Sequence, residues 1–274
     1  MHAMSDVVAV VLARGHGHRM RRADTSAHLT PDQEAAAEAG GKVFMPFRGH
    51  RYLDYVLSSL ADAGYRRAGL VIGPEHRVSC QPYIAPGRSA RVSVELIEQP
   101  QARGTADAVR SAETWVDHSP FVVLNGDNLY PVPVLRDLAR LNGPGLAGFA
   151  RDQLVQSGGL PPSRIQSFAL ISVDDFGHLS GIVEKPTADQ AEAAGPSALV
   201  SMNCWRFDDR MFSACAEVAV SARGEYELPD AVMLARERGV QFTVIRGTGP
   251  VLDLSSRADI PEVDRHLAGV EPRP

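Results

Sequence analysis

Residues 7–20 read VVAVVLARGHGHRM, and this segment sets the expectation for the whole chain. Its first part, residues 7–12, is a continuous apolar run typical of a strand buried on both faces of a parallel sheet. In the loop that follows, Gly15 and Gly17 let backbone N–H groups approach an anion closely, and Arg19 adds a planar fork of donors for phosphate. Ligands of open α/β sheets bind at the carboxyl ends of strands. The segment therefore favours a phosphate site, with an ordinary strand-to-helix turn as the competing interpretation.

Two common phosphate motifs do not fit this loop. The dinucleotide-binding fingerprint needs a third glycine, which the segment lacks, and a Walker loop needs a Gly-Lys-Ser/Thr ending. A dehydrogenase is disfavoured for the same reason, and because the acidic residue that would bind the ribose is missing.

Alternating strands and helices are predicted along the rest of the chain. Apolar runs predict strands at residues 68–72, 92–97, 121–124, 169–173, 181–183 and 240–245. Helical spacing predicts helices at residues 51–63, 105–115 and 228–238, the first of them ended by Gly64. This alternation predicts an α/β fold with a mostly parallel sheet.

Three segments break the pattern. Residues 21–41 are polar and alanine-rich and are expected to form a mobile insertion, in which Thr30 caps a helix that starts at Pro31. Residues 154–162 are expected to form a Gly/Pro-rich loop, and the tail 269–274 is expected to fray. We interpret residues 1–274 as a single domain that carries the insertion 21–41 and the tail 269–274.

Composition narrows the class of protein. The 274 residues are 44% hydrophobic and 22% charged, enough for a large core, and the formal net charge of −5 argues against a nucleic-acid surface. The three cysteines form no CxxC pair and suit buried thiols. No apolar run is long enough for a membrane span and no signal peptide is recognised, so we expect a cytoplasmic protein with no membrane partner.

Two further segments carry candidate residues, one around Lys42 and one that joins a strand to a helix and contains Gln99 and Gly104. Lys42 follows a glycine pair and could reach a phosphate, although a lysine among apolar residues is more often a surface residue. Gln99 could bind a base edge through its amide, and Gly104 would allow close approach at a helix start. The alternative is a simple helix start with Thr105 as its N-cap.

Carboxylates and one lysine make up the other candidates. Asp127 follows a buried strand and could hold Mg²⁺, or form an Asx turn. Glu184 and Lys185 end another strand, where an exposed ion pair is the common case. Asp253 stands between apolar neighbours and needs a partner, which could be a metal shared with Asp127, a salt bridge or an N-cap role.

Taken in order, these segments resemble the sugar-phosphate nucleotidylyltransferases, the family of glucose-1-phosphate thymidylyltransferase and the UDP-sugar pyrophosphorylases. The resemblance spans residues 7–267. It implies a Rossmann-like three-layer α/β sandwich with a mixed, mostly parallel sheet. It also implies Mg²⁺-dependent transfer of a nucleoside monophosphate from a nucleoside triphosphate to a sugar 1-phosphate, with release of pyrophosphate.

The resemblance also implies a role for each candidate. Arg19, Lys42, Asp127 and Lys185 match the catalytic positions, and Asp127 and Asp253 match the two metal aspartates. Sugar contacts would come from Glu184, Lys185 and Asn203. Nucleotide contacts would come from Leu12, Ala13, Arg14, Gly15, Gly17, Gln99, Gly104 and Thr105.

Several positions depart from the family pattern. Arg14 stands where the family usually has Ala or Gly, His18 where Thr is frequent, and Gly41 where Pro usually precedes the lysine. Ala169 replaces a glycine near the sugar. These departures leave two alternatives open: transfer to a cyclitol, alditol or choline phosphate, and a catalytically inactive nucleotide sensor. The base (uracil, thymine or adenine) and the state (monomer or homodimer) also stay open.

Overall fold

The computed structural model describes residues 7–15, 17–24, 27–85, 87, 90–158, 160, 162–165 and 168–274. His16 of the glycine loop, residues 25 and 26 of the predicted insertion, and residues 159 and 161 of the predicted loop lie outside these ranges. No helix of the described part is long and apolar enough to cross a membrane.

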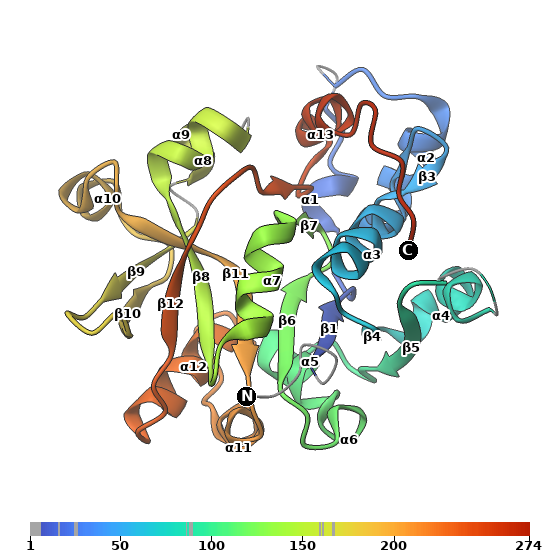
Figure 1. Ribbon diagram of the computed structural model, residues 1–274. Coiled ribbons are helices and arrows are strands. Elements are labelled where there is room, and N and C mark those ends of the chain that lie inside the picture. Colours follow the sequence, from blue (N-terminus) through green and yellow to red (C-terminus); the bar gives the residue numbers. More distant parts are fainter. Residues whose placement is uncertain are drawn as a thin grey trace.

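A nine-stranded mixed sheet forms the centre of the protein (Figure 1). The strand order along its main path is β10-β9-β11-β6-β1-β4-β5. Strand β8 pairs with β11 and also with β12. The strands are β1 Val8–Leu12, β4 Arg67–Ile72, β5 Ser93–Glu98, β6 Phe121–Asn125, β8 Gly145–Ala150, β9 Ala169–Val173, β10 Leu179–Val183, β11 Leu199–Phe207 and β12 Thr243–Gly247.

Helices and short strands complete the fold. The longer helices are α2 Pro31–Ala39, α3 Tyr52–Ala63, α7 Val132–Arg140, α8 Arg151–Gly158, α10 Ala188–Ala194, α11 Arg210–Glu217, α12 Leu228–Glu237 and α13 Ile260–His266. The shorter ones are α1 His18–Arg21, α4 Arg77–Cys80, α5 Thr105–Arg110, α6 Glu113–Val116 and α9 Pro162–Ile165, with 3-10 turns η2 Lys42–Phe44, η3 Pro74–His76, η4 Gln81–Ile84 and η5 Arg257–Asp259. Two small ladders join β2 Pro46–Phe47 to β3 His50–Arg51, and β7 Asn128–Leu129 to β13 Leu252–Asp253.

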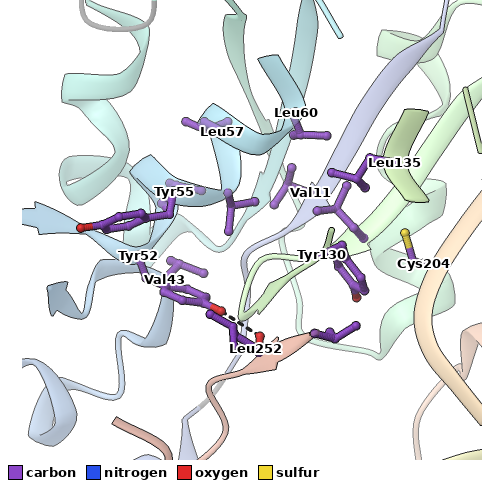
Figure 2. Packing of buried hydrophobic residues seen from close by; sticks show 14 of the residues in the cluster. Val11, Val43, Tyr52, Tyr55, Leu57, Leu60, Tyr130, Leu135, Cys204 and Leu252 are labelled. Atoms are coloured by element: carbon purple, nitrogen blue, oxygen red, sulfur yellow. Dashed lines mark hydrogen bonds between the residues drawn. The ribbon is translucent and has the colours of Figure 1, made fainter. Parts of the chain in front are cut away.

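Strand β1 explains why the chain forms three layers. Val11 belongs to a core cluster with α3 and α7 on one face, and Val10 to a second cluster with α5, α11 and α12 on the other. Successive side chains of a strand point to opposite faces, so a strand covered on both faces is apolar throughout. Figure 2 shows Val11, Val43, Leu57 and Leu60 packed in the first cluster. The predicted α/β three-layer class is confirmed.

The central sheet is mixed and combines parallel with antiparallel pairings. Strands β6, β1, β4 and β5 are parallel to one another, as are β8 and β12. Strand β11, which the sequence analysis did not predict, is antiparallel to β6, β8 and β9. One edge of β11 pairs first with β9 and then with β6, with an irregularity in its pairing to β8 between Ser201 and Trp205. This arrangement places Asn203 at the fork where β6 ends and β9 begins.

The predicted helix boundaries agree with the structure for one helix and differ from it for another. Helix α3 matches its prediction, and Gly64 ends it with the left-handed φ of 104°. The helix predicted for residues 105–115 ends at Arg110 and resumes as α6. Ser111 Oγ donates to the Asp107 carbonyl, and Ala112 N bonds to Val109, so the ladder tightens there. The Thr105 N-cap is wrong: Gly104 is the N-cap, and the Thr105 hydroxyl accepts from Leu228 N at 2.9 Å.

The irregular segments contain more structure than predicted. In residues 21–41, Thr30 caps α2 and Pro31 is at its start, as expected, but Gln33 Nε2 donates to the Pro46 carbonyl and Ala37 is fully buried. This helix packs on the core and differs from a mobile insertion. Residues 154–162 are not a simple loop, because α8 extends to residue 158 and α9 starts at Pro162.

The carboxyl-terminal tail lies against the protein instead of fraying. Arg273 N donates to Ser58 Oγ of α3 at 3.0 Å, and Arg91 Nη1 donates to the Arg273 carbonyl at 3.1 Å. The three cysteines are free and buried, as predicted. Burial raises the pKa of the Cys80 thiol to about 11.

Candidate active site

A cavity of about 360 Å³ opens at the carboxyl ends of β1 and β6. Backbone bonds converge there: Ala13 N donates to the Val71 carbonyl, and Gly126 N to the Leu12 carbonyl, both at 2.9 Å. Ten predicted site residues line the cavity, namely Leu12, Ala13, Arg14, Gly15, Arg19, Lys42, Gln99, Gly104, Thr105 and Asp127. Gly17, Asp253, Glu184, Lys185 and Asn203 are not among its lining residues. His76, Asn125 and Glu225 also line the cavity, although no sequence signal marked them as binding residues.

The two glycines of the loop do different jobs. A Cβ added to Gly15 would meet no atom within 4 Å, so its backbone faces open space. A Cβ on Gly17 would lie 2.3 Å from the Gly40 carbonyl oxygen, and Gly17 has a left-handed φ of 61°. Gly15 is therefore available to a ligand, whereas Gly17 is required for packing on the end of α2.

Alanine at these two glycines should separate binding from stability. Gly17→Ala should lower the free energy of unfolding by about 2–4 kcal/mol, through the clash with Gly40 and the left-handed backbone. Gly15→Ala should change it by less than about 0.5 kcal/mol, yet weaken triphosphate binding. Urea unfolding followed by circular dichroism measures the free energy of unfolding of both variants, and equal losses of stability would contradict this division of roles.

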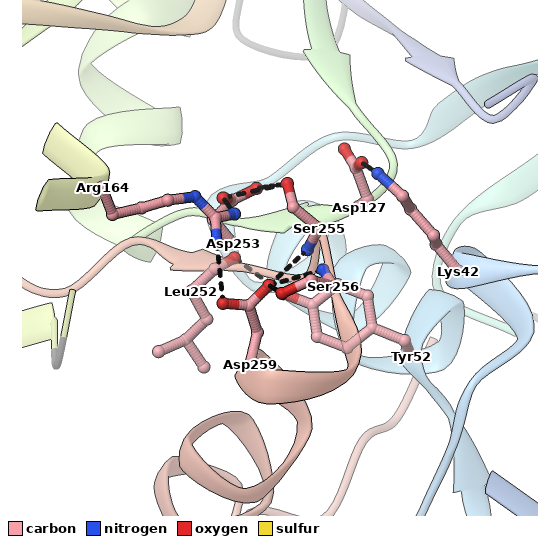
Figure 3. Close-up of polar contacts among 9 residues, drawn as sticks. All are labelled: Lys42, Tyr52, Asp127, Arg164, Leu252, Asp253, Ser255, Ser256 and Asp259. Carbon is pink, nitrogen blue, oxygen red and sulfur yellow. Dashed lines mark hydrogen bonds and ion pairs between the residues drawn. The ribbon is translucent and has the colours of Figure 1, made fainter. Parts of the chain in front are cut away.

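Lys42 and Asp127 form an ion pair inside the cavity (Figure 3). Lys42 Nζ lies 2.7 Å from Asp127 Oδ2, and the side chains are 14% and 23% exposed. Lys42 comes from η2, directly after the glycine pair that ends α2, and Asp127 follows β6. The pair places a cation and an anion together at the carboxyl end of the central strands. Lys42 is therefore not an exposed surface lysine, and the Asp127 carboxylate is not isolated.

Asp253 lies next to Asp127 along the backbone ladder. It pairs with Asn128 between β13 and β7, and Leu254 N donates to the Asp127 carbonyl at 2.9 Å. The Asp253 side chain is 6% exposed. Burial and the nearby Asp127 carboxylate raise the pKa of Asp253, while Arg164, which forms an ion pair with it, opposes the rise. Of the metal, salt-bridge and N-cap alternatives for Asp253, the structure contains the salt bridge, with Arg164 as its partner.

The donor set suits a magnesium ion in part. Within the described residues no cluster of three or more Asp, Glu, His or Cys side chains could hold a metal. Mg²⁺ is usually held by one or two carboxylates together with substrate phosphates, and Asp127 and Asp253 supply two hard oxygen ligands, the first of which raises the pKa of the second. The residues therefore fit a metal that arrives with a phosphate ligand.

Gln99 and Arg14 contact each other in one wall of the cavity. Gln99 Nε2 donates to the Asp107 carboxylate at 2.8 Å and to the Gly104 carbonyl at 3.1 Å, so both its amide hydrogens are used within the protein. Arg14 donates to the Gln99 carbonyl and, at 3.3 Å, to Glu75. The Arg14 side chain is held against this wall and is 10% exposed, which leaves the Gly15 backbone accessible.

Gly104 is required by the protein itself. A Cβ there would lie 2.5 Å from the Tyr226 carbonyl oxygen, and its φ is 116°. Ala106 N donates to that same carbonyl at 2.9 Å. The close approach predicted at Gly104 is therefore made by the backbone of Tyr226. The residue before it, Glu225, lines the cavity.

The predicted sugar-side residues lie around the fork of β11. Lys185 follows β10 with φ 44°, and Asn203 sits in β11 with φ 58°. Non-glycine residues rarely adopt such backbone angles, and those that do cluster at functional sites. Tyr130 Oη, donating to the Met202 carbonyl at 2.6 Å, fixes the Asn203 segment. Partial burial and the Glu227 carboxylate raise the pKa of Glu184. The structure does not bring these residues into the 360 Å³ cavity.

The chain is similar to known nucleotidyltransferases in sequence and in fold. The nucleotidyl transferase family profile matches residues 8–249. The UTP–glucose-1-phosphate uridylyltransferase AglF of Haloferax volcanii is 28% identical over 260 residues, covering 94% of this chain and 96% of the relative. The low-salt glycan biosynthesis nucleotidyltransferase Agl11 of the same organism is 27% identical over 84% of this chain, and the chain spans only 57% of that relative's length. A crystal structure of UDP-glucose pyrophosphorylase complexed with UDP-glucose superposes with a TM-score of 0.74 at 16% identity, covering 97% and 99% of the two chains.

Proposed function

We propose that this chain, which belongs to the nucleotidyl transferase family, joins a nucleoside triphosphate to a sugar 1-phosphate. The products are a nucleoside diphosphate sugar and pyrophosphate. One observation carries the proposal: the open backbone of Gly15, Arg19, Lys42 and Asp127 line a single cavity at the carboxyl ends of the central strands. The uridylyltransferase relative, which shares nearly its full length with this chain, supports the same reaction.

The triphosphate would lie along the glycine loop. The Ala13–Gly15 backbone would face its phosphates, and Arg19, which is exposed at the cavity rim, would neutralise the departing pyrophosphate. The base would lie toward Gln99 and Gly104. Because the Gln99 amide hydrogens are already bound to Asp107 and Gly104, and its backbone carbonyl to Arg14, base contacts at this wall would use the Gln99 side-chain oxygen or the Arg14 guanidinium.

The reaction needs no general base, because the attacking phosphate is already an anion. An oxygen of the sugar 1-phosphate forms a bond to the α-phosphorus while the bond from the α-phosphorus to the bridging β-phosphate oxygen breaks, and pyrophosphate leaves. Lys42 would transfer from Asp127 to the reacting phosphates and hold them in line. Asp127 and Asp253 would hold Mg²⁺, whose charge would stabilise the phosphates in the transition state.

The sugar phosphate would enter from the fork of β11. Lys185 would hold its phosphate, and Glu184 and Asn203 would contact sugar hydroxyls. The strained backbone at Lys185 and Asn203 supports this assignment, since it fixes both side-chain directions at one end of the sheet. The chain would act as a single domain, in the cytoplasm, as a monomer or homodimer without a nucleic-acid partner.

Pyrophosphate release over a grid of nucleoside triphosphates and acceptor phosphates tests the proposal. We expect turnover with sugar 1-phosphates and a preference for one base. Turnover only with a cyclitol, alditol or choline phosphate would identify the other transferase class. Tight triphosphate binding with no pyrophosphate from any acceptor would instead identify an inactive sensor, an outcome that the open Gly15 backbone beside Arg14 argues against.

A further inference from the structure

Arg164 reaches the carboxylate cluster from a distant part of the chain (Figure 3). It lies on the four-residue helix α9, and its guanidinium bridges Asp253 and Asp259 near the carboxyl-terminal helix. Nη1 lies 2.9 Å from Asp259 Oδ1, while Nη2 forms an ion pair with Asp253 Oδ2. The three side chains are only 16%, 13% and 6% exposed. The contact therefore joins two buried carboxylates through one cation.

The two carboxylates are held in unequal ways. Asp259 Oδ2 accepts from Ser255 N at 2.9 Å, Ser256 N at 2.6 Å and Ser256 Oγ at 3.0 Å, which leaves Oδ1 for Arg164. Asp253 has a single neutral donor, Ser255 Oγ, at 3.0 and 3.1 Å from its two oxygens. Asp259 is thus a fixed anchor for Arg164. Asp253 can exchange its charged partner without losing its place in the ladder.

We propose that Arg164 is a built-in counter-ion that occupies Asp253 until a divalent cation displaces it. The proposal rests on the proposed function, because it takes Asp253 to be a metal ligand. Lys42 likewise forms an ion pair with Asp127. Each of the two proposed metal ligands is therefore paired with a cationic side chain of the protein when no substrate is bound. After displacement, Arg164 keeps Asp259 as its partner and stays at the edge of the site.

This arrangement makes metal binding depend on the nucleotide. A bare divalent cation has to compete with a guanidinium that already satisfies Asp253, whereas a cation bound to a triphosphate brings its own anionic ligands. Without Arg164, Asp253 would keep only the neutral Ser255 hydroxyl as a side-chain donor, beside an Asp127 that is paired with Lys42. Opposite charges at hydrogen-bond distance alter cation binding to a carboxylate by tenfold or more. Arg164 therefore keeps the nucleotide-free protein from binding free metal tightly.

Binding of Mn²⁺ to the full, nucleotide-free chain tests the proposal. Mn²⁺ prefers the same oxygen ligands as Mg²⁺ and is followed by electron paramagnetic resonance. Arg164→Gln should bind Mn²⁺ roughly tenfold or more tightly than the unmodified chain. Arg164→Lys should show a smaller gain, because one ammonium group cannot bridge both carboxylates. The matched control is Arg238→Gln, which removes an arginine that is paired with Glu217 and does not line the cavity, and it should leave the affinity unchanged.

Unchanged Mn²⁺ affinity in both Arg164 variants would overturn the proposal and leave Arg164 with only a packing role. If Arg164→Gln does not fold, as judged by circular dichroism, Arg164→Lys decides alone. The nucleotidyl transfer itself is measured separately by pyrophosphate release. An active enzyme whose Arg164 variants bind Mn²⁺ normally would retain the proposed function and lose this inference, and a chain with no turnover would lose the function first.

Discussion

Asp127→Asn should lower pyrophosphate release on the order of a thousandfold while leaving the fold intact. The amide keeps the shape of the carboxylate but loses its charge, so it neither pairs with Lys42 nor holds a divalent cation. The ion pair is partly exposed, and its removal relieves the charge that raises the pKa of Asp253. Thermal unfolding should therefore move little. The rate is measured with a coupled pyrophosphate assay under saturating triphosphate.

Asp62→Asn is the matched control for this variant. Asp62 also forms an ion pair, with Arg91 at 2.7 Å, but is partly exposed and does not line the cavity. It should retain normal turnover. Turnover of Asp127→Asn within a few fold of the unmodified chain would remove Asp127 from the reaction and, with it, the metal assignment.

Lys42→Met should lower kcat/KM by about a hundredfold or more, because the reacting phosphates lose the cation closest to Asp127. Methionine keeps an unbranched apolar stem, so the local structure of η2 should be preserved. Lys42→Arg keeps the charge but presents a planar fork instead of a point charge, and should be intermediate. Steady-state kinetics with both substrates varied separates the loss of binding from the loss of rate.

The chain offers an independent measurement at the same residue. Of its 28 basic residues only Lys42 and Lys185 are lysines. Acylation of lysine followed by peptide mass spectrometry therefore reports on the two proposed phosphate contacts almost alone. A nucleoside triphosphate should protect Lys42, and a sugar 1-phosphate should protect Lys185. Equal labelling of Lys42 with and without triphosphate would contradict its role.

Local sequence predicts the parallel half of the fold well. The residues of β1 are apolar because both faces are covered, and the glycine that ends α3 has the left-handed angle that only glycine adopts easily. Much of the cavity follows from the same signals, since its walls include the loops after β1, β5 and β6. Short polar segments placed after buried strands are therefore strong predictors of a site.

Strands β8 and β11 were missed for identifiable reasons. Strand β8 contains Gly145 and Gly148, where a Cβ would lie 2.5 Å from the Thr243 carbonyl and 2.8 Å from Ile171. Crowding selects glycine there and removes the β-branched pattern of a buried strand. Strand β11 contains Ser201, Asn203 and Arg206, because it bends around the fork of the sheet. No local pattern marks either strand.

The long-range contacts of the site also escape sequence reasoning. Arg164 meets Asp253 across 89 residues, and Gly104 is required by the Tyr226 backbone. The sequence indicated that Asp253 needs a partner but not which one. The two lysines are the exception, because their rarity in an arginine-rich chain is a signal that composition alone could have used.

The most direct test of the account follows the α-phosphorus. The full chain is incubated with an α-³²P-labelled nucleoside triphosphate and a sugar 1-phosphate that supports turnover. Nucleotidyl transfer predicts that the label appears in a nucleoside diphosphate sugar, with one pyrophosphate formed for each product molecule. Label that stays in free nucleotide, with orthophosphate released or nothing released at all, would contradict the central claim.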